Sequence, residues 1–280
     1  MIFHNYHTHT SYCDGGEVPD LYVKRAIALG FGSLGFSGHA PVPFPNNFAI
    51  DSTKLISYIN EIQLLKSVYK EIIPIYSSLE MDYIPGISTD FSIFTDFCKL
   101  DYSIGSVHLV KRKGQEGLWF IDGSKVSTYD KGLEQLFGGD IQLAVESYYR
   151  QIAEMAQTQN PDIIGHFDKI KMHNRNRYFN ETDSWYRIVV SQTLDVIKAS
   201  GSIIEVNTRG LYKKRTNSLF PSVSILEEIS AKGIPITLNS DAHLPGDLNL
   251  FFEESHQIIR TIGFKSIKIL SKQGWVDQEI

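Results

Sequence analysis

The sequence lacks three features that would each point to a particular class of protein. It contains only two cysteines, Cys13 and Cys98, so the disulfide framework of a small secreted domain is excluded. No apolar run approaches the ~20 residues that a transmembrane helix needs. The opening stretch MIFHNYHTHT has neither the basic nor the apolar segment of a secretory signal peptide. We therefore expect a cytoplasmic protein that does not associate with a membrane.

The chain also lacks the excess of positive charge that nucleic-acid-binding proteins usually carry. Its 27 Lys and Arg residues are outnumbered by 32 Asp and Glu residues, which gives a net charge of −5. There is no low-complexity segment and no Pro/Ser-rich linker, and 42% of the residues are hydrophobic. We expect residues 1–280 to form one domain, an enzyme acting on a small molecule, and nucleic acid is disfavoured as a partner.

Short apolar runs alternate with helical patterns along the whole chain. The runs predict strands at 2–6, 33–37, 73–79, 102–107, 162–165, 202–206 and 234–239, and a terminal strand at 267–270. Helices are predicted at 19–29, 54–72, 184–199, 221–231 and 251–262, and one more after a capping Asp140. Continuously apolar strands that alternate with helices favour a parallel sheet covered by helices. Seven or eight such units predict a closed (β/α) barrel.

Potential metal ligands stand at the carboxyl end of almost every predicted strand. His7 and His9 follow the first strand, and residues i and i+2 of a strand project from the same face. Two imidazoles on one face can bind a transition metal, although a single pair could be an accident of a half-buried strand. The pattern recurs at the ends of later strands, in His39, Glu80, His108, His166, Asp241 and His243.

A closed barrel brings all of these strand ends to one rim, where (β/α) barrels carry their active sites. Asp14 adds a further carboxylate to the same rim. Nine potential ligands are too many for one four-coordinate ion, so two or three ions fit better, with Glu80 as a bridge. Three divalent ions would outweigh the three carboxylates, and such a site would attract an anion, of which phosphate is the obvious candidate.

The motifs at these strand ends resemble, in order and spacing, those of the PHP (polymerase and histidinol phosphatase) superfamily. They are H-x-H at 7–9, S-G-H-A at 37–40, S-L-E at 78–80, S-V-H at 106–108, I-G-H-F-D at 164–168 and N-S-D-A-H at 239–243. The stretches Y-H-T-H-T-x-Y-C-D-G at 6–15, G-F-S-G-H-A-P at 35–41 and W-F-I-D-G at 119–123 are similar to the monofunctional histidinol-phosphate phosphatases within it.

The resemblance implies a distorted (β/α)7 TIM-like barrel with three divalent metal ions, which could be zinc, iron or manganese. It implies one ion held by His7, His9, Glu80 and Asp241, a second by Glu80, His108 and His166, and a third by Asp14, His39 and His243. Many relatives carry a histidine where Asp14 stands. A carboxylate there would make the third site harder and less suited to zinc, which leaves the identity of the metal open.

The resemblance also implies an activity, the hydrolysis of L-histidinol phosphate to L-histidinol and phosphate in histidine biosynthesis. Asp241, His243 or a metal-bound water could help the leaving alkoxide. Arg209 and one arginine of the loop after the fifth strand, Arg175 or Arg177, are candidates for binding the substrate phosphate. Arg177 is favoured because Tyr178 and Phe179 follow it and could anchor the loop. The charged run 213–215 is interpreted as solvated. Other functions stay open: a phosphodiesterase or nuclease acting on nucleic acid, a phosphatase for another small metabolite, and a non-catalytic metal-binding domain.

The segment 109–139, between the fourth predicted strand and its helix, is unusually long. Trp119, Phe120 and Ile121 lie in it among glycines, a pattern that predicts a hairpin over the mouth of the barrel. Such a flap could cover the substrate imidazole and exclude water. Packing at the edge of the barrel is an equally good interpretation of the same residues.

Overall fold

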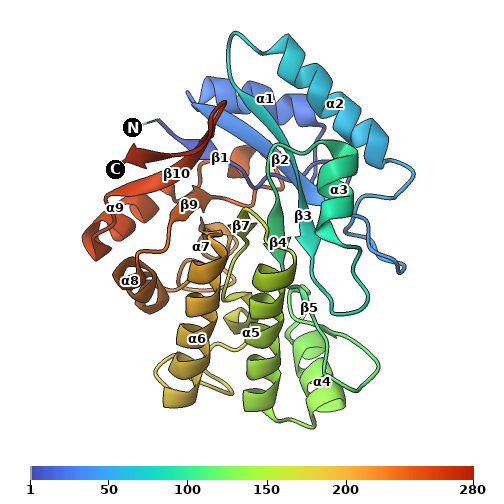
Figure 1. Ribbon diagram of the computed structural model, residues 1–280, viewed down its shortest axis with the longest axis vertical. Helices are drawn as coiled ribbons and strands as arrows, with labels where there is room; N and C mark the ends of the chain where they lie inside the picture. Colours follow the sequence, from blue (N-terminus) through green and yellow to red (C-terminus); the bar gives the residue numbers. More distant parts are fainter. Residues whose placement is uncertain (1) are drawn as a thin grey trace.

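The computed structural model describes residues 2–280 and contains a seven-stranded parallel sheet with helices around it (Figure 1). The strands follow the order β1-β2-β3-β4-β7-β8-β9, and every neighbouring pair is parallel. Their bounds are β1 His4–Asn5, β2 Ser33–His39, β3 Ile75–Asp82, β4 Ile104–Ser106, β7 Ile163–Ile164, β8 Ile203–Asn207 and β9 Ile236–Asn239. Each of the seven predicted barrel strands is therefore present.

The first and last strands of the sheet meet just beyond their carboxyl ends. The backbone N–H of His9 donates to the carbonyl of Ala242 at 2.8 Å, and that of Ala242 donates to the carbonyl of His7 at 3.0 Å. Thr8 and Ala242 thus form a parallel bridge that nearly closes the sheet. The predicted distorted (β/α)7 TIM-like barrel is confirmed, and its closure brings the first and last ligand-bearing segments together.

The strands are buried on both sides because helices cover the outside of the sheet (Figure 1). All residues of β2 and β8 are buried. The helices are α1 Pro19–Ala28, α2 Leu55–Val68, α3 Phe91–Cys98, α4 Val126–Phe137, α5 Ile141–Thr158, α6 Ser184–Ser200, the short α7 Arg209–Tyr212, α8 Val223–Lys232 and α9 Phe252–Ile262. Helix α5 starts as predicted, since the Asp140 carboxylate accepts the N–H of Leu143 at 3.0 Å.

The segment after β4 contains the predicted hairpin, but also a helix that the sequence pattern did not reveal. Strands β5 Leu109–Val110 and β6 Trp119–Phe120 pair in antiparallel fashion. Helix α4 then places Gly132 against the indole of Trp119, where any Cβ would approach a ring carbon to 2.2 Å. The buried Trp119 therefore anchors the hairpin to α4. The residues that follow Trp119 continue toward the barrel mouth, where Phe120 and Asp122 line the cavity.

The prediction that 267–270 forms a strand is confirmed, although this strand lies outside the barrel sheet. It belongs to β10 Ser266–Ser271, which pairs in antiparallel fashion with β11 Gly274–Glu279. This hairpin closes the amino-terminal end of the barrel: the Leu270 N–H donates to the Tyr6 hydroxyl at 2.8 Å, and Trp275 packs edge-on against Tyr6. The opposite end, where the strands terminate, stays open to solvent.

Candidate metal and phosphate site

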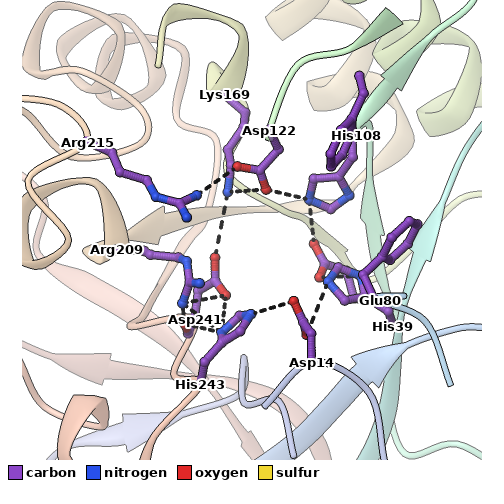
Figure 2. Close-up of a pocket in the computed structure, with 12 residues that line it drawn as sticks. Asp14, His39, Glu80, His108, Asp122, Lys169, Arg209, Arg215, Asp241 and His243 are labelled. Atoms are coloured by element: carbon purple, nitrogen blue, oxygen red, sulfur yellow. Dashed lines mark hydrogen bonds and ion pairs between the residues drawn. The ribbon is translucent and has the colours of Figure 1, made fainter. Parts of the chain in front are cut away.

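A cavity of about 100 Å³ opens at the carboxyl ends of the barrel strands (Figure 2). Six of the nine predicted ligands line it: Asp14, His39, Glu80, His108, Asp241 and His243. The other three, His7, His9 and His166, are almost completely buried beneath it. Residues from both ends of the chain therefore meet in one cluster, because the barrel closes between β1 and β9.

Glu80 lies at the centre of this cluster, at a position fully buried within β3. Its Oε1 lies 2.9 Å from Nε2 of His166 and 3.6 Å from Nε2 of His108. Its Oε2 lies 3.1 Å from Nε2 of His7, 3.4 Å from Nε2 of His9 and 3.2 Å from Nδ1 of His39. Each carboxylate oxygen thus faces a different group of imidazoles, which is the geometry of a carboxylate that bridges two ions.

Asp14 and Asp241 approach the remaining imidazoles from the rim. The Asp14 carboxylate lies 3.2 Å from Nε2 of His243, 3.6 Å from Nδ1 of His9 and 3.9 Å from Nε2 of His39. Oδ1 of Asp241 lies 3.4 Å from Nε2 of His9. Four groups have ligand atoms close enough to share an ion: His9 with Asp14, His39 and His243; His7 with Glu80 and His166; His7 with His9 and Asp241; and His39 with Glu80 and His108.

The buried nitrogens of this cluster fit a metal centre better than a hydrogen-bond network. Within residues 2–280, Nε2 of His7, Nε2 of His9 and Nδ1 of His39 are buried and form no hydrogen bond. Leaving such groups unpaired is costly, and native proteins avoid it. The Nε2 atoms of His108 and His166 face each other at 3.1 Å. Divalent ions would satisfy all of these atoms at once, and imidazole with carboxylate is a donor set that zinc, iron and manganese accept.

Two residues of the cluster have a strained backbone. His166 adopts φ 22° and Asp241 adopts φ 53°, in the region of positive φ that residues other than glycine rarely occupy. Such conformations cost of the order of 1–3 kcal/mol each and concentrate at functional sites. Both residues follow the end of a barrel strand, and the sharp turn aims their side chains back into the barrel mouth.

Two buried carboxylates that were not predicted from the sequence orient the histidines through their Nδ1 atoms. Glu205, in the middle of β8, accepts a hydrogen bond from Nδ1 of His7 at 2.6 Å and another from the backbone N–H of His166 at 2.8 Å. Asp82 accepts one from Nδ1 of His108 at 2.8 Å. A histidine that donates through Nδ1 keeps the lone pair of Nε2 free for a metal. A glutamate inside the apolar run I-I-E-V-N was the available signal, since a buried carboxylate needs partners.

Three cationic side chains line the cavity beside the ligand cluster. Nη1 of Arg209 donates to the backbone carbonyl of Asp241 at 2.8 Å. Lys169 lies in the 3₁₀ turn Lys169–Lys171 after β7, and its Nζ is 3.1 Å from Asp122; Arg215 approaches the same carboxylate at 3.1 Å (Figure 2). Asp122 therefore holds two cations in place at the cavity wall. Arg209 was predicted here, whereas Lys169 and Asp122 were missed and Arg215 was interpreted as solvated.

Arg177 is the predicted site residue that the structure does not bring to the cavity. Its guanidinium forms a bidentate pair with Asp130 at 2.8 and 2.9 Å and also donates to the backbone carbonyl of His173. These contacts direct Arg177 toward α4 rather than toward the ligand cluster. Of the two aromatic residues expected to anchor the loop, Phe179 is buried, whereas Tyr178 is exposed and lies against the guanidinium itself, 4.8 Å from ring centroid to Cζ.

The charges of the cluster are mutually compensating. Burial alone would raise the pKa of Glu80, but the neighbouring histidines lower it well below its usual range, so the group is ionised. Burial would likewise lower the pKa of Arg209, but Asp241 raises it above its ordinary value. Burial and the adjacent His243 and His39 lower the pKa of His9 to about 3, which keeps its imidazole neutral, the form that binds metals.

The family model described as the PHP domain matches residues 5–209, nearly three quarters of the chain. The chain belongs to this family. It is 30% identical to the histidinol-phosphatase of Bacillus subtilis over 266 residues, a match that covers 88% of this chain and 96% of the relative. The sequence resemblance to the histidinol-phosphate phosphatases is thereby confirmed.

Solved structures share the fold over nearly the whole chain. The histidinol phosphate phosphatase of Lactococcus lactis, solved with zinc, L-histidinol and phosphate, gives a TM-score of 0.72 at 24% identity and covers 98% of both chains. A structure from Listeria monocytogenes gives a TM-score of 0.76 at 22% identity, covering 90% of this chain and 99% of the other. The PHP barrel thus extends beyond the segment that the family model matches.

Within residues 2–280, none of the helices combines the length and the apolar composition that crossing a bilayer would take.

Proposed function

We propose that this chain is a metal-dependent phosphomonoesterase that hydrolyses L-histidinol phosphate to L-histidinol and inorganic phosphate. The observation that carries the proposal is a single cluster of nine candidate metal ligands, six of which line the same cavity as Arg209, Lys169 and Arg215. Metal ligands beside fixed cations form a site for a phosphate dianion. The relative from Bacillus subtilis is a histidinol-phosphatase, and the one from Lactococcus lactis was solved with the two products of this reaction.

Three divalent ions would share the ligand cluster. His7, His9, Glu80 and Asp241 would hold one, Glu80, His108 and His166 a second, and Asp14, His39 and His243 a third. The contacts of Glu80 with His7 and His166 and of Asp14 with His243 agree with this division, and the further contacts of Glu80 with His39 and of Asp14 with His9 place the three sites side by side. When bound, such ions neutralise phosphate charge and lower the pKa of water toward ~7, which provides the nucleophile. The zinc in the relative from Lactococcus lactis favours zinc, while the carboxylate of Asp14 favours a harder ion.

The cationic side chains would bind the phosphoryl group and hold it in line for attack. Arg209 is held by the backbone carbonyl of Asp241, and Lys169 and Arg215 by Asp122, so that all three are positioned before the substrate arrives. Fixed donors of this kind stabilise charge on the equatorial oxygens without reorganisation during the reaction. Arg209 is retained as a phosphate-binding residue, as proposed from the sequence. Lys169 and Arg215 replace Arg177 in that role.

The leaving alkoxide must receive a proton as its bond to phosphorus breaks. Attack by water releases one proton, and the departing alkoxide takes one up. Asp241 and His243 lie at the cavity wall with Oδ1 and Nδ1 3.4 Å apart, and we propose that this pair transfers the proton from the water to the alkoxide. The products would be a neutral alcohol group and inorganic phosphate.

Release of phosphate from a panel of esters tests the proposal. The metal-loaded enzyme should cleave L-histidinol phosphate far faster than p-nitrophenyl phosphate or single-stranded DNA. The variant His9→Ala should lose both metal and activity, while Glu227→Ala, an exposed position on α8, should lose neither. Faster cleavage of DNA would overturn the proposal, and so would full activity and metal content in His9→Ala.

A further inference from the structure

Two phenylalanines are the only apolar side chains among the twelve residues that line the cavity, and the mechanism above does not use them. Phe48 lies in the loop between β2 and α2, and Phe120 ends β6 in the hairpin after β4. Their rings are nearly parallel, with planes 15° apart and centroids separated by 6.4 Å. Both side chains are only half-buried, so they present apolar surface to a cavity that is otherwise charged.

The loop that carries Phe48 is held in place by a side chain. Oδ1 of Asn46 accepts the backbone N–H of Phe48 at 3.1 Å and that of Ala49 at 2.7 Å, which forms an Asx turn. The Phe48 ring meets the imidazole of His39 edge-on, with centroids 5.2 Å apart. Its position relative to the ligand cluster is therefore defined, although its loop is on the surface.

Phe120 is supported equally closely by the backbone around it. Leu109 pairs with Phe120 across the hairpin, and the N–H of Ile121 donates to the carbonyl of His108 at 3.0 Å. A Cβ on Gly123 would lie 3.3 Å from two carbons of the Phe120 ring, so the bare glycine backbone packs against the ring. His173 donates through Nε2 to the carbonyl of Gly123 at 2.6 Å and fixes that backbone in turn.

We propose that Phe48 and Phe120 form an aromatic wall that stacks against a flat heteroaromatic ring of the substrate. The wall selects phosphomonoesters that carry such a ring over aliphatic ones. Arg209, Lys169 and Arg215 take the phosphoryl end of the ligand, and the two rings take its aromatic end. An aromatic ring that packs on other rings gains energy beyond the burial of its surface. This inference rests on the proposed function and assigns residues to the recognition of the imidazole in L-histidinol phosphate.

The test compares two substrates in each protein, so that a general loss of activity does not affect the result. The selectivity is the ratio of kcat/KM for L-histidinol phosphate to kcat/KM for glycerol 3-phosphate. Each of Phe48→Leu and Phe120→Leu should lower this ratio about 3- to 10-fold, mainly through KM for the aromatic ester, and the double variant should lower it further. Phe120→Tyr keeps the ring and should keep the ratio. Phe97→Leu, on the exposed face of α3, is the matched control.

The outcomes separate this inference from the proposed function. A wild-type enzyme that prefers L-histidinol phosphate, with the preference lost in the double leucine variant, supports the aromatic wall. A preference that persists in the double variant overturns the wall and leaves the proposed function intact. Equal losses on both esters also overturn the wall, since they indicate a structural role. A wild-type enzyme with no preference for the aromatic ester contradicts both proposals.

Discussion

The carboxylate of Glu205 lies 2.6 Å from Nδ1 of His7, and both side chains are fully buried. The carboxylate can only accept, so His7 donates through Nδ1 and directs Nε2 toward Glu80, 3.1 Å away. Glu205 also accepts amide hydrogens from Asn207 and Asn239 at 3.0 and 3.1 Å, which fixes it on both sides. A residue that touches no predicted ion thus determines which nitrogen of His7 faces the cluster.

Glu205→Gln should weaken metal binding while the barrel remains folded. Glutamine preserves the shape of the side chain but presents an amide NH₂ that competes for the orientation of His7, and loss of such an outer partner typically costs 10- to 100-fold in metal affinity. Zinc affinity, measured by competition with a chelator, and the metal content per chain check this. Glu227→Gln, exposed on α8, should behave as wild type. Unchanged zinc affinity in Glu205→Gln would show that the hydrogen bond does not orient His7 for a metal.

Arg209→Ala should lower kcat/KM for L-histidinol phosphate by about 100- to 1,000-fold, because one fixed donor to the transition-state charge is lost. Arg177→Ala should change kcat/KM by less than about 3-fold, since this guanidinium is paired with Asp130 outside the cavity. Steady-state kinetics of the two variants at the same metal loading provide the comparison. Similar losses in both variants would mean that Arg177 moves to the phosphate when substrate binds.

Asp14→His should shift the metal preference of the cluster toward zinc. Asp14 is the one ligand of its group that is not an imidazole, and it faces His9, His39 and His243. Replacing a hard carboxylate by imidazole favours zinc over manganese. Competitive loading with equal amounts of the two metals, followed by elemental analysis, gives the ratio in each protein. A ratio unchanged from wild type would indicate that residue 14 does not bind an ion.

The stability of the protein should fall between pH 7 and pH 5 partly because of His256. Burial lowers the pKa of this histidine to about 4, whereas the unfolded chain titrates near 6.5. The unfolded state therefore takes up the proton first. The contribution is fully present above pH 6.5 and is lost as the pH falls toward 4. The free energy of unfolding that is lost between pH 7 and pH 5 should therefore be smaller in His256→Gln than in wild type, by about 2 kcal/mol. Urea unfolding at both pH values measures the difference, and equal losses would contradict the assignment.

The strands and the ligand cluster could be predicted from the sequence because two independent patterns agree. Buried parallel strands appear as continuous apolar runs, and the residues that follow them stand at the catalytic rim of a barrel. His39, Glu80 and Asp241 could therefore be placed without knowing any contact. The residues that support the site could not be assigned in the same way. Glu205 lies in the middle of β8 and Asp82 is the last residue of β3, and their role depends on which histidine each contacts in the folded chain.

The positions of the cationic residues could not be predicted from the sequence either. Arg215 belongs to the charged run 213–215, which looks solvated, and only the path of the loop after α7 brings it to Asp122. Arg177 was predicted to bind the phosphate because aromatic residues follow it, yet its guanidinium forms an ion pair with Asp130 on α4. Helix α4 itself lies in a segment expected to form a hairpin. Contacts between two irregular segments are set by tertiary packing, which local sequence does not encode.

The central claim, that the clustered histidines and carboxylates bind the ions on which a phosphatase depends, is tested most directly by removing and restoring the metal. Phosphate release from L-histidinol phosphate is measured on the purified enzyme, after exhaustive chelation, and after zinc or manganese is added back. We expect chelation to abolish activity, and two to three ions per chain to restore it. Full activity in protein shown by elemental analysis to be free of metal would contradict the account.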